Sequence, residues 1–312
     1  MNQLLRQLLE ANGVRMDDAM TAVLSRQLEY VKAQTYDIEY SKLKAREFIP
    51  ISNEVPEGAE AMVYRSWDET GMAKVISDYA DDLPMVDALA KEHMVTFTDL
   101  GDAYSWTVRD LKRAAFGGIP LDAKKAQAAR NVLERKIDDI AAFGLPEKAL
   151  PGFLNHPNVP EIAAVNGDWL NPATTPDQIL ADLFALEQAV INQTLEVHEA
   201  DTLLLPVPLY GKIATTSYGA NSDRTILRYF LENAQSIKNV DKWSKLNTAG
   251  DAGAPRAVAY ARTPEVVEFQ IPQEFEQLPP QQRNMSYVVN CLARVGGVLF
   301  YRPLAAAYMD LA

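Results

Sequence analysis

The chain has 312 residues, of which 48% are apolar and 23% are charged, an ordinary balance for a globular protein with room for about two domains. The formal net charge of −12 argues against a dedicated nucleic-acid binder, which normally carries a basic face. No apolar run reaches the roughly 18 residues of a membrane span, and the first residues lack a signal-peptide pattern. We therefore expect a soluble intracellular product.

The N-terminal 46 residues are predicted to form an arm. One short amphipathic helix is followed by three tyrosines, Tyr30, Tyr36 and Tyr40, which are scattered through polar sequence. Such a segment buries little apolar surface by itself. It needs a partner, which is either the body of the same chain or another subunit.

The next segment is acidic and is predicted to contain a hairpin. Between Glu54 and Asp102 there are twelve Asp or Glu and three Lys or Arg, which leaves the rest of the chain nearly balanced. This excess indicates either a solvated acidic surface or a surface that meets a basic neighbour. Residues 59–67 and 72–79 mix polar and apolar positions around Asp68–Gly71, which predicts two strands with a four-residue turn. An isolated hairpin is marginal in water, so this one must lie on something.

Residues 91–120 are predicted to form a short strand and then a helix from about Thr107, broken by Gly117 and Gly118. The double glycine lacks the residues of a phosphate loop and indicates a linker.

The clearest helix is predicted at residues 121–144. Asp122 is the expected N-cap, and Gly144 with Pro146 ends the helix. An apolar stripe runs along it at spacings of three and four, comprising Ala126, Ala129, Leu133, Ile137 and Ile140. Arg130 with Glu134 and Arg135 with Asp139 are spaced for ion pairs on the solvated face. A helix of this length is typical of a structural spine.

A second lobe is predicted over residues 152–251. Thr175 and Pro176 begin a helix that ends near His198. Residues 201–210 are typical of a buried strand whose end is confined to a sheet edge by Pro206 and Pro208. Another helix is expected to be capped by residues 221–223. This alternation predicts a small α/β layer.

Residues 252–312 return to strands. Residues 256–262 and 267–271 are predicted strands, the second with one buried face because apolar and polar residues alternate. Residues 286–303 form a long β-branched run in which Gly296 and Gly297 indicate a bulge or bend. These strands are expected to pack back on the spine helix.

No chemical motif accompanies these elements. His93, His156 and His198 lie far apart, so no metal-site spacing is present. Cys291, the only cysteine, lies in an apolar run and is predicted to be a buried, inert thiol. The sequence therefore predicts no catalytic, metal or cofactor site. We expect a protein that is not an enzyme.

Acidic pairs do not change this prediction. Asp81 with Asp82 and Asp138 with Asp139 are adjacent, so their side chains point apart, and we expect them to be solvated charges.

The order of these segments resembles the major capsid proteins of tailed bacteriophages, which share the Hong Kong 97-type fold, and most of all a subgroup long described only as a phage or prophage family. The resemblance covers nearly the whole chain. It is carried by RQLEYVKAQTYDIEY, FIPISNEVPEGAEAMVYRSWDETGMAKVI, DLPMVD, LDAKKAQAARNVLERKIDDIAAFG, GFLNHPNV, DTLLLPVPLYGKI, TILRYFLENAQSI, AVAYARTPEVVEFQIPQEFEQLPPQ and RVGGVLFYRPLAAAYMD.

The resemblance implies an α+β capsid fold with named regions. Residues 1–46 would be the N-terminal arm, and 47–90 the extended loop. Residues 91–151 would be the peripheral domain with the spine helix, and 152–251 the axial domain. Residues 252–312 would complete both domains' sheets.

The resemblance also implies contacts between subunits. The extended-loop residues concerned are Tyr64, Arg65, Trp67, Asp68, Glu69 and Lys74. Those of the arm are Tyr30, Tyr36 and Tyr40.

The implied function is a self-assembling icosahedral head shell of hexamers and pentamers that encloses double-stranded DNA without reading its sequence. The shell would be assembled in the host cytoplasm, with scaffold, portal and decoration proteins as further partners. Net negative charge is compatible with enclosing DNA without gripping it. The alternatives are an encapsulin-like nanocompartment shell of the same fold and, less favoured, a cytosolic α/β enzyme.

Two family features do not carry over. Some relatives have a scaffolding segment before the arm, so we expect a separate scaffold here or the loss of that segment. Some relatives crosslink Lys to Asn, but Lys74 is the only lysine between Phe48 and Ala90, and no crosslink is predicted.

Overall fold

The computed structural model describes residues 41–72, 74, 85–110, 116, 121–219 and 223–311. The chain divides into two compact units, Met1–Lys42 and Leu43–Ala312, and the account below concerns the second. Arm residues Tyr30, Tyr36 and Tyr40 and the acidic pair Asp81–Asp82 lie outside the described residues.

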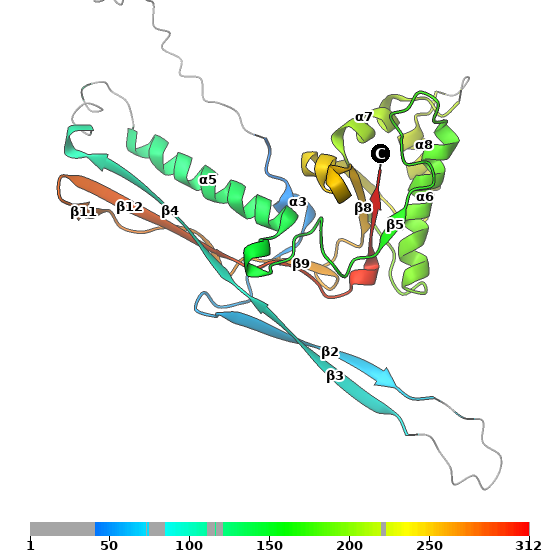
Figure 1. The fold of residues 1–312 in the computed structure, drawn as a ribbon, viewed down its shortest axis with the longest axis horizontal. Helices are drawn as coiled ribbons and strands as arrows, with labels where there is room; N and C mark the ends of the chain where they lie inside the picture. The colour runs from blue at the N-terminus through cyan, green and yellow to red at the C-terminus, as the bar shows by residue number, and fades with distance from the viewer. Residues whose placement is uncertain are drawn as a thin grey trace, which may run out of the picture. The chain divides into compact units, whose positions relative to one another are not determined.

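The spine helix is present as α5 (Leu121–Phe143), as predicted (Figure 1). Its apolar stripe is buried at Ala129, Leu133, Ile137 and Ile140. The predicted cap was wrong, because the helix begins at Leu121 and Asp122 lies inside it.

Acidic residues of α5 also pair with other elements. Glu134 pairs with Arg46, and Asp139 pairs with Lys245, both from outside the helix. Asp138 is buried, not solvated as predicted, and its Oδ1 accepts a hydrogen bond of 2.8 Å from the Ala45 backbone N–H. The helix is therefore tied to elements far away in the sequence.

A long sheet lies against one face of α5 and follows the order β10–β12–β11, with β4 also paired to β12. Its strands are β4 (Thr98–Thr107), β10 (Gln273–Gln277), β11 (Gln281–Arg283) and β12 (Ser286–Val295). Trp106, Val289 and Cys291 pack with Ala129 and Leu133 of the helix. The C-terminal strands thus return to the spine helix as expected, and Cys291 is fully buried.

The second lobe is built on a mixed five-stranded sheet with the order β5–β14–β8–β6–β7. Its strands are β5 (Glu161–Ala163), β6 (Thr202–Leu205), β7 (Asn239–Lys242), β8 (Arg256–Tyr260) and β14 (Ala306–Asp310). Alternate residues of β8 belong to two different cores: Val258 and Tyr260 to one, Ala257 and Ala259 to the other. The sheet is therefore buried on both faces.

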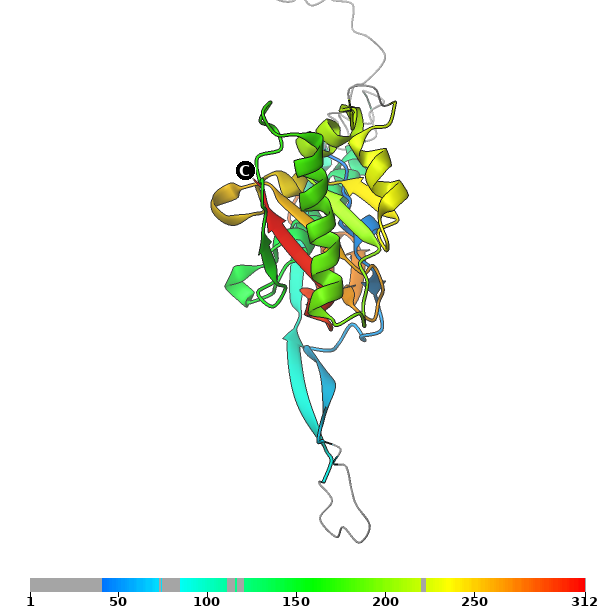
Figure 2. The same ribbon diagram turned by 90° about the vertical axis from the view of Figure 1, so that its right-hand side faces the viewer.

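Helices α6 (Pro176–Gln193), α7 (Val207–Thr215) and α8 (Ile226–Asn233) contribute to the second of these cores (Figure 2). Thr175 caps α6 as predicted, and it forms a capping box with Gln178. Figure 2 shows α6 running along the sheet.

Three details of this lobe were predicted wrongly. Strand β6 is not at a sheet edge but lies between β7 and β8, and Pro206 with Pro208 begins helix α7. Proline suits the first helical turn because the N–H that it lacks has no partner there. Helix α6 ends at Gln193, before His198, and α8 is capped by Thr225.

A smaller sheet, β1–β9–β13, joins the N-terminal and C-terminal parts of this unit. Its strands are β1 (Ile51–Ser52), β9 (Val267–Gln270) and β13 (Val298–Phe300). The bend predicted at Gly296–Gly297 separates β12 from β13, and a Cβ on Gly297 would lie 3.0 Å from the Pro151 carbonyl oxygen.

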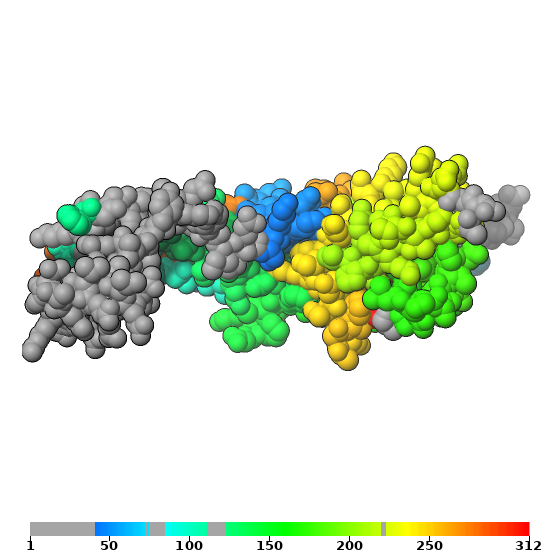
Figure 3. Space-filling view, turned by 90° about the horizontal axis from the view of Figure 1, so that it is seen from above, coloured from blue at the N-terminus to red at the C-terminus, as the bar shows by residue number. Residues whose placement is uncertain are grey.

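The segment that begins at Leu43 packs into the same body. The short helix α3 (Ala45–Phe48) buries Ala45 and Phe48 against the spine-helix core. In Figure 3 the segment that contains it, coloured blue, lies between green atoms and yellow to orange atoms. Lys44 Nζ donates to the Lys242 carbonyl at 3.1 Å, so the segment contacts the second lobe as well.

Short 3-10 turns complete the fold. They are η1 (Pro146–Lys148), η2 (Ser244–Thr248), η3 (Asp251–Gly253) and η4 (Pro303–Ala305). Among the described residues, no helix is long and apolar enough to cross a membrane.

The hairpin exists, but its strands are longer than predicted and its turn is elsewhere. Strand β2 (Ala61–Thr70) pairs with β3 (Asp87–Thr96), and Asp68 lies opposite Leu89 (Figure 1). Asp68–Thr70 is thus strand, not turn, because a partner ten residues long lies further along the chain. The predicted second strand at 72–79 falls largely outside the described residues.

The end of α5 supplies a test of the packing. Gly144 has φ +72, and a Cβ added to it would lie 2.2 Å from the Leu150 carbonyl oxygen. We expect Gly144→Ala to lower the free energy of unfolding by about 3 kcal/mol or more. Alanine is strained in the left-handed backbone conformation, and its Cβ would overlap the Leu150 carbonyl oxygen. Chemical denaturation of the full chain and of the variant measures the two free energies of unfolding.

Gly211→Ala is the matched control. Gly211 lies inside α7, and a Cβ there would meet nothing within 4 Å. We expect this change to raise stability by about 0.5–1 kcal/mol, through helix propensity. Equal effects of the two substitutions would contradict the packing described around Gly144.

Candidate assembly surfaces

The β2–β3 hairpin has two faces of different character. Residues that lie opposite each other in an antiparallel pair share a face. One face carries Val63 with Met94, Arg65 with Glu92, and Trp67 with Ala90. Val63, Trp67 and Met94 are 54%, 67% and 71% exposed, so this outer face is an apolar surface that the described part of the chain leaves uncovered.

The opposite face contacts the body of the same chain near the base of the hairpin. Tyr64 stacks on His93 with ring centroids 4.8 Å apart and meets Tyr301 edge-on at 5.0 Å. Tyr301 in turn donates a 3.0 Å hydrogen bond to Glu268, and burial raises the pKa of the Tyr64 phenol. These contacts fix the direction in which the hairpin leaves the body.

Further bonds anchor the base. The Phe97 N–H donates to the Glu60 carbonyl at 3.2 Å. Arg294 of β12 donates to the Glu57 carbonyl and forms an ion pair of 2.6 Å with Asp99. The hairpin is thus attached at its base to the strand that packs on the spine helix.

The six extended-loop residues singled out from the sequence are not equivalent. Arg65, Trp67 and Glu69 lie on the outer face, whereas Tyr64 and Asp68 lie on the other. Tyr64 is half-buried against its own chain. Lys74 is exposed and follows β2. Sequence reasoning missed Val63 and Met94, because their pairing becomes visible only with the true register.

Buried carboxylates in the second lobe serve the fold. Glu187 Oε1 accepts hydrogen bonds from the backbone N–H groups of Ser236 and Ile237, at 2.7 and 3.2 Å. Asp182 accepts from the Trp169 indole N–H at 2.9 Å and from the Val165 backbone. Donors occupy Glu187 Oε1 and both oxygens of Asp182, which is the usual arrangement for a structural carboxylate, whereas Glu187 Oε2 is buried without a hydrogen-bond partner.

A second carboxylate group surrounds Arg256. Glu161, Asp251 and Asp310 bring their oxygens close together, and Arg256 donates to Asp310 at 2.5 Å and to Glu161 at 3.2 Å. Burial opposes ionisation of Asp310, but the hydrogen bonds from Arg256 and the Asp251 N–H, together with the charge of Arg256, lower the pKa of that carboxyl. Burial raises the pKa of Glu161, and the charge of Asp310 adds to this. The guanidinium occupies the position that a cation would take.

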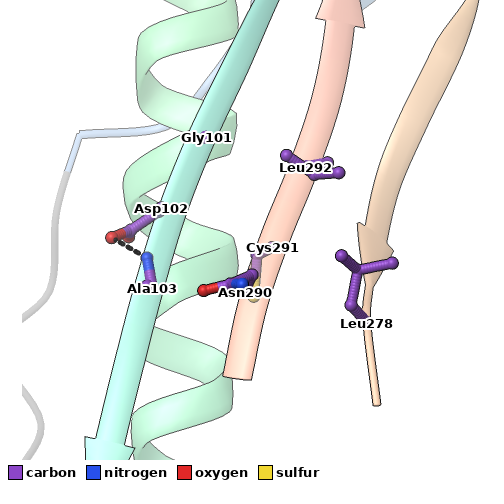
Figure 4. Close-up of a pocket in the computed structure, with 7 residues that line it drawn as sticks. All are labelled: Gly101, Asp102, Ala103, Leu278, Asn290, Cys291 and Leu292. Atoms are coloured by element: carbon purple, nitrogen blue, oxygen red, sulfur yellow. Dashed lines mark hydrogen bonds between the residues drawn. The ribbon is translucent and has the colours of Figure 1, made fainter. Parts of the chain in front are cut away.

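An open depression of about 530 Å³ lies along β4 and β12 (Figure 4). It is lined by Gly101, Asp102, Ala103, Leu278, Asn290, Cys291 and Leu292. Burial, and then the charge of Asp102, raise the pKa of the Cys291 thiol. A thiol with a raised pKa is a poor nucleophile, and the lining groups form no acid–base pair. The residues that line the depression therefore offer no catalytic group.

Two features indicate assembly. The outer face of the hairpin is apolar and exposed, and the base of the hairpin is held to the body by hydrogen bonds and an ion pair. A family model described as "Major capsid protein" matches residues 71–311. The chain belongs to the major capsid protein family. It is a major capsid protein, the structural subunit of a capsid shell.

Solved structures agree on the fold. The capsid of Myoviridae phage XM1 aligns with a TM-score of 0.83 at 19% identity, over 92% of this chain and 98% of that one. A structure described as Mycobacterium phage Bobi aligns with a TM-score of 0.63 at 14% identity, over 95% of this chain and 99% of that one. A virus-like particle from Pyrococcus furiosus aligns with a TM-score of 0.55 at 13% identity, over 85% of this chain and 91% of that one. No curated protein matches the sequence significantly.

These comparisons confirm the Hong Kong 97-type fold and the family expected from the sequence. The major capsid protein, rather than the nanocompartment shell, is the family that the match supports.

The connector after the spine helix supplies a pH prediction. His156 is buried, with its ring against Phe300 and its Nδ1 accepting from the Asn158 N–H at 3.2 Å. Burial lowers the pKa of His156 to about 4. The unfolded chain binds a proton below about pH 6.5, whereas the folded chain does not until about pH 4.

We therefore expect stability to fall as the pH drops from about 6.5 to 4, by on the order of 3 kcal/mol from this group. His156→Asn keeps an acceptor for the Asn158 N–H and removes the titration. The difference in unfolding free energy between the two proteins is measured at pH 7 and pH 4. A constant difference would show that His156 is not held neutral by burial.

Proposed function

We propose that this chain self-assembles into the icosahedral head shell of a tailed phage or prophage, and that its hairpin lies across a neighbouring copy. The observation that carries the proposal is the outer face of the hairpin, with Val63, Trp67 and Met94 all more than half exposed. An isolated two-stranded ribbon is marginal in water, and each of its strands has an edge without a strand partner among the described residues.

Burial on a neighbour would stabilise this ribbon. Covering the exposed part of Val63, Trp67 and Met94 contributes about 1 to 2 kcal/mol for each side chain. Small contributions of this kind add up in a closed shell, because each copy both gives and receives the contact. Arg65 and Glu92, 63% and 60% exposed, add polar specificity at the edge of the contact.

The regions take the roles that the sequence suggested. We assign residues 1–46 as the arm, 47–90 as the extended loop, 91–151 as the peripheral domain, 152–251 as the axial domain and 252–312 as the strands that complete both domains. Tyr64, Arg65, Trp67, Asp68, Glu69 and Lys74 are proposed loop contacts, and Tyr30, Tyr36 and Tyr40 proposed arm contacts.

The contents and partners of the shell are part of the same proposal. A net charge of −12 suits a lining that encloses double-stranded DNA without gripping it. Scaffold, portal and decoration proteins are the expected partners during assembly in the host cytoplasm, and the chain itself has no catalytic role.

Shortening the hairpin tests this function. Arg65 lies opposite Glu92, so replacing residues 65–92 by Asn-Gly joins Tyr64 to His93 through a tight turn and keeps the base contacts. We expect the body to fold with its ordinary circular dichroism and particles to be lost. Sedimentation and electron microscopy of the full chain and the variant measure this.

The control is Val165→Ser, which changes a side chain that is 79% exposed in the second lobe, away from the hairpin. It should form particles like the unmodified chain. Normal particles from the shortened variant would overturn the role of the hairpin. An unmodified chain that stays strictly monomeric even with scaffold and portal present would overturn the shell itself.

A further inference from the structure

Four side chains form a row that joins the hairpin to the body. His93 of β3 stacks on Tyr64 of β2, Tyr64 meets Tyr301, and the Tyr301 hydroxyl donates to Glu268 of β9. None of the four belongs to the three hydrophobic cores that the described residues form. The row therefore adds little to the packing that stabilises the body, and its place beside the hairpin calls for another explanation.

At one end of the row, Tyr64 is attached firmly to the hairpin. Its ring is nearly parallel to the His93 imidazole, with an interplanar angle of 12°. The two residues lie opposite each other in the strand pair, and His93 Nε2 lies 3.1 Å from Ser66 Oγ on the same face. The Tyr64 ring therefore moves with the strands and not independently of them.

At the other end, Tyr301 is attached firmly to the body. Its backbone N–H donates to the Val266 carbonyl at 2.9 Å, and its hydroxyl donates to Glu268 Oε2 at 3.0 Å. Glu268 lies on β9, the middle strand of the β1–β9–β13 sheet, and the same oxygen accepts from Gln270 Nε2 at 3.0 Å. Tyr301 thus presents a fixed ring to the hairpin.

The contact between Tyr64 and Tyr301 is where these two rigid parts meet. Their ring planes are at 87°, in the edge-to-face arrangement that aromatic pairs favour. Hydrogen bonds at Glu57 and Glu60 hold only the base of the hairpin. Among the described residues, no other helix or strand packs extensively against β2 or β3, which run out from the body in Figure 1. The ring contact therefore limits sideways movement of the hairpin.

The length of the hairpin magnifies the effect of this contact. Strand β2 runs from Ala61 to Thr70. At about 3.4 Å per residue, Tyr64 lies roughly 10 Å from the start of the strand, and Thr70 lies roughly 31 Å from it. A displacement of Tyr64 by about 1 Å therefore becomes a displacement of about 3 Å at the far end of the strand.

We propose that Tyr64 is a positioning residue: held by His93 and stopped by Tyr301, it sets the angle of the hairpin and through it the curvature of the shell. This rests on the proposed function, because the angle matters only if the outer face meets another subunit. Tyr64 lies on the inner face, so it acts through the direction of the hairpin. Closed rings of identical copies need a fixed rotation from one copy to the next, and a loose hairpin would not provide it.

Distances between spin labels on the unassembled full chain measure the angle directly. The labels are attached to Glu69→Cys on the hairpin and Val132→Cys on α5, both exposed, whereas Cys291, the only native cysteine, is buried. Tyr64→Ala should broaden the distribution of distances about twofold or more, because the stop is lost. Tyr64→Phe keeps the ring and should leave the distribution unchanged. An unchanged distribution with Tyr64→Ala would overturn the proposal.

A second pair of variants tests the body end of the row and does not alter the hairpin. Tyr301→Phe keeps the ring but loses the hydrogen bond to Glu268, so it should also broaden the distances. Glu268→Gln keeps an oxygen that can accept from Tyr301 and should give the unmodified distribution. An unchanged distribution with Tyr301→Phe would overturn the stop.

Tyr218→Ala is the matched control. It removes a tyrosine that stacks on Tyr229 at 4.2 Å in the second lobe, a contact of the same kind away from the hairpin. The distribution of distances should stay as in the unmodified chain. The melting temperature of Tyr64→Ala should change by less than about 3 °C, because the ring lies outside the cores. Broadening by Tyr218→Ala equal to that by Tyr64→Ala would overturn the assigned role.

Electron microscopy of particles separates this proposal from the proposed function. Without labels, Tyr64→Ala should give no closed shells or shells whose diameters vary about twofold more widely, whereas Tyr64→Phe should match the unmodified chain. Uniform shells from Tyr64→Ala would overturn the positioning role and leave the shell function in place. Absence of particles from the unmodified chain, even with scaffold and portal present, would overturn the shell function, and the label distances would still decide whether Tyr64 sets the angle.

Discussion

The structure depends on one constraint: the β2–β3 hairpin cannot bury its own outer face. Among the described residues no third layer covers the two strands, and the body contacts the inner face, through Tyr64. The described part of the chain therefore leaves the apolar residues of the outer face for another partner to bury. This explains how a chain without catalytic chemistry in its described residues can have a specific function.

The body is built to hold that hairpin in a fixed direction. Alternate residues of β8 belong to two cores, and α5 packs on the strand pair β4–β12. Buried charges join distant segments: Asp138 bonds to Ala45, and Arg256 bonds to Asp310 and to the Leu154 carbonyl. Breaking such a bond leaves a buried charge unpaired, which costs far more than a surface pair contributes. Shell geometry requires this rigidity, because small angular errors accumulate around a ring.

Local patterns predicted the elements whose cause is local. The spine helix followed from its apolar period, Thr175 from capping chemistry, and the bend at Gly296 and Gly297 from the break in a β-branched run. The hairpin turn was misplaced because Asp68 to Gly71 has the composition of a turn, while the true partner strand lies about twenty residues further on. Pro206 was misassigned because proline suits both a strand end and a helix start.

The outer face of the hairpin was harder to predict because it depends on residues far apart in the sequence. Trp67 was expected as a contact from the resemblance alone, and Val63 and Met94 become neighbours only through the register of two separated strands. The resemblance to phage capsid proteins supplied the function, which neither composition nor motif contained.

The central claim is that the outer face of the hairpin is exposed in a single chain and covered in the shell. Hydroxyl-radical footprinting of Trp67 and Met94 measures this in intact particles and in dissociated subunits. We predict that labelling of both residues falls several-fold on assembly, while Val165 is labelled equally in the two states. Equal labelling of Trp67 and Met94 in particles and subunits would contradict the account.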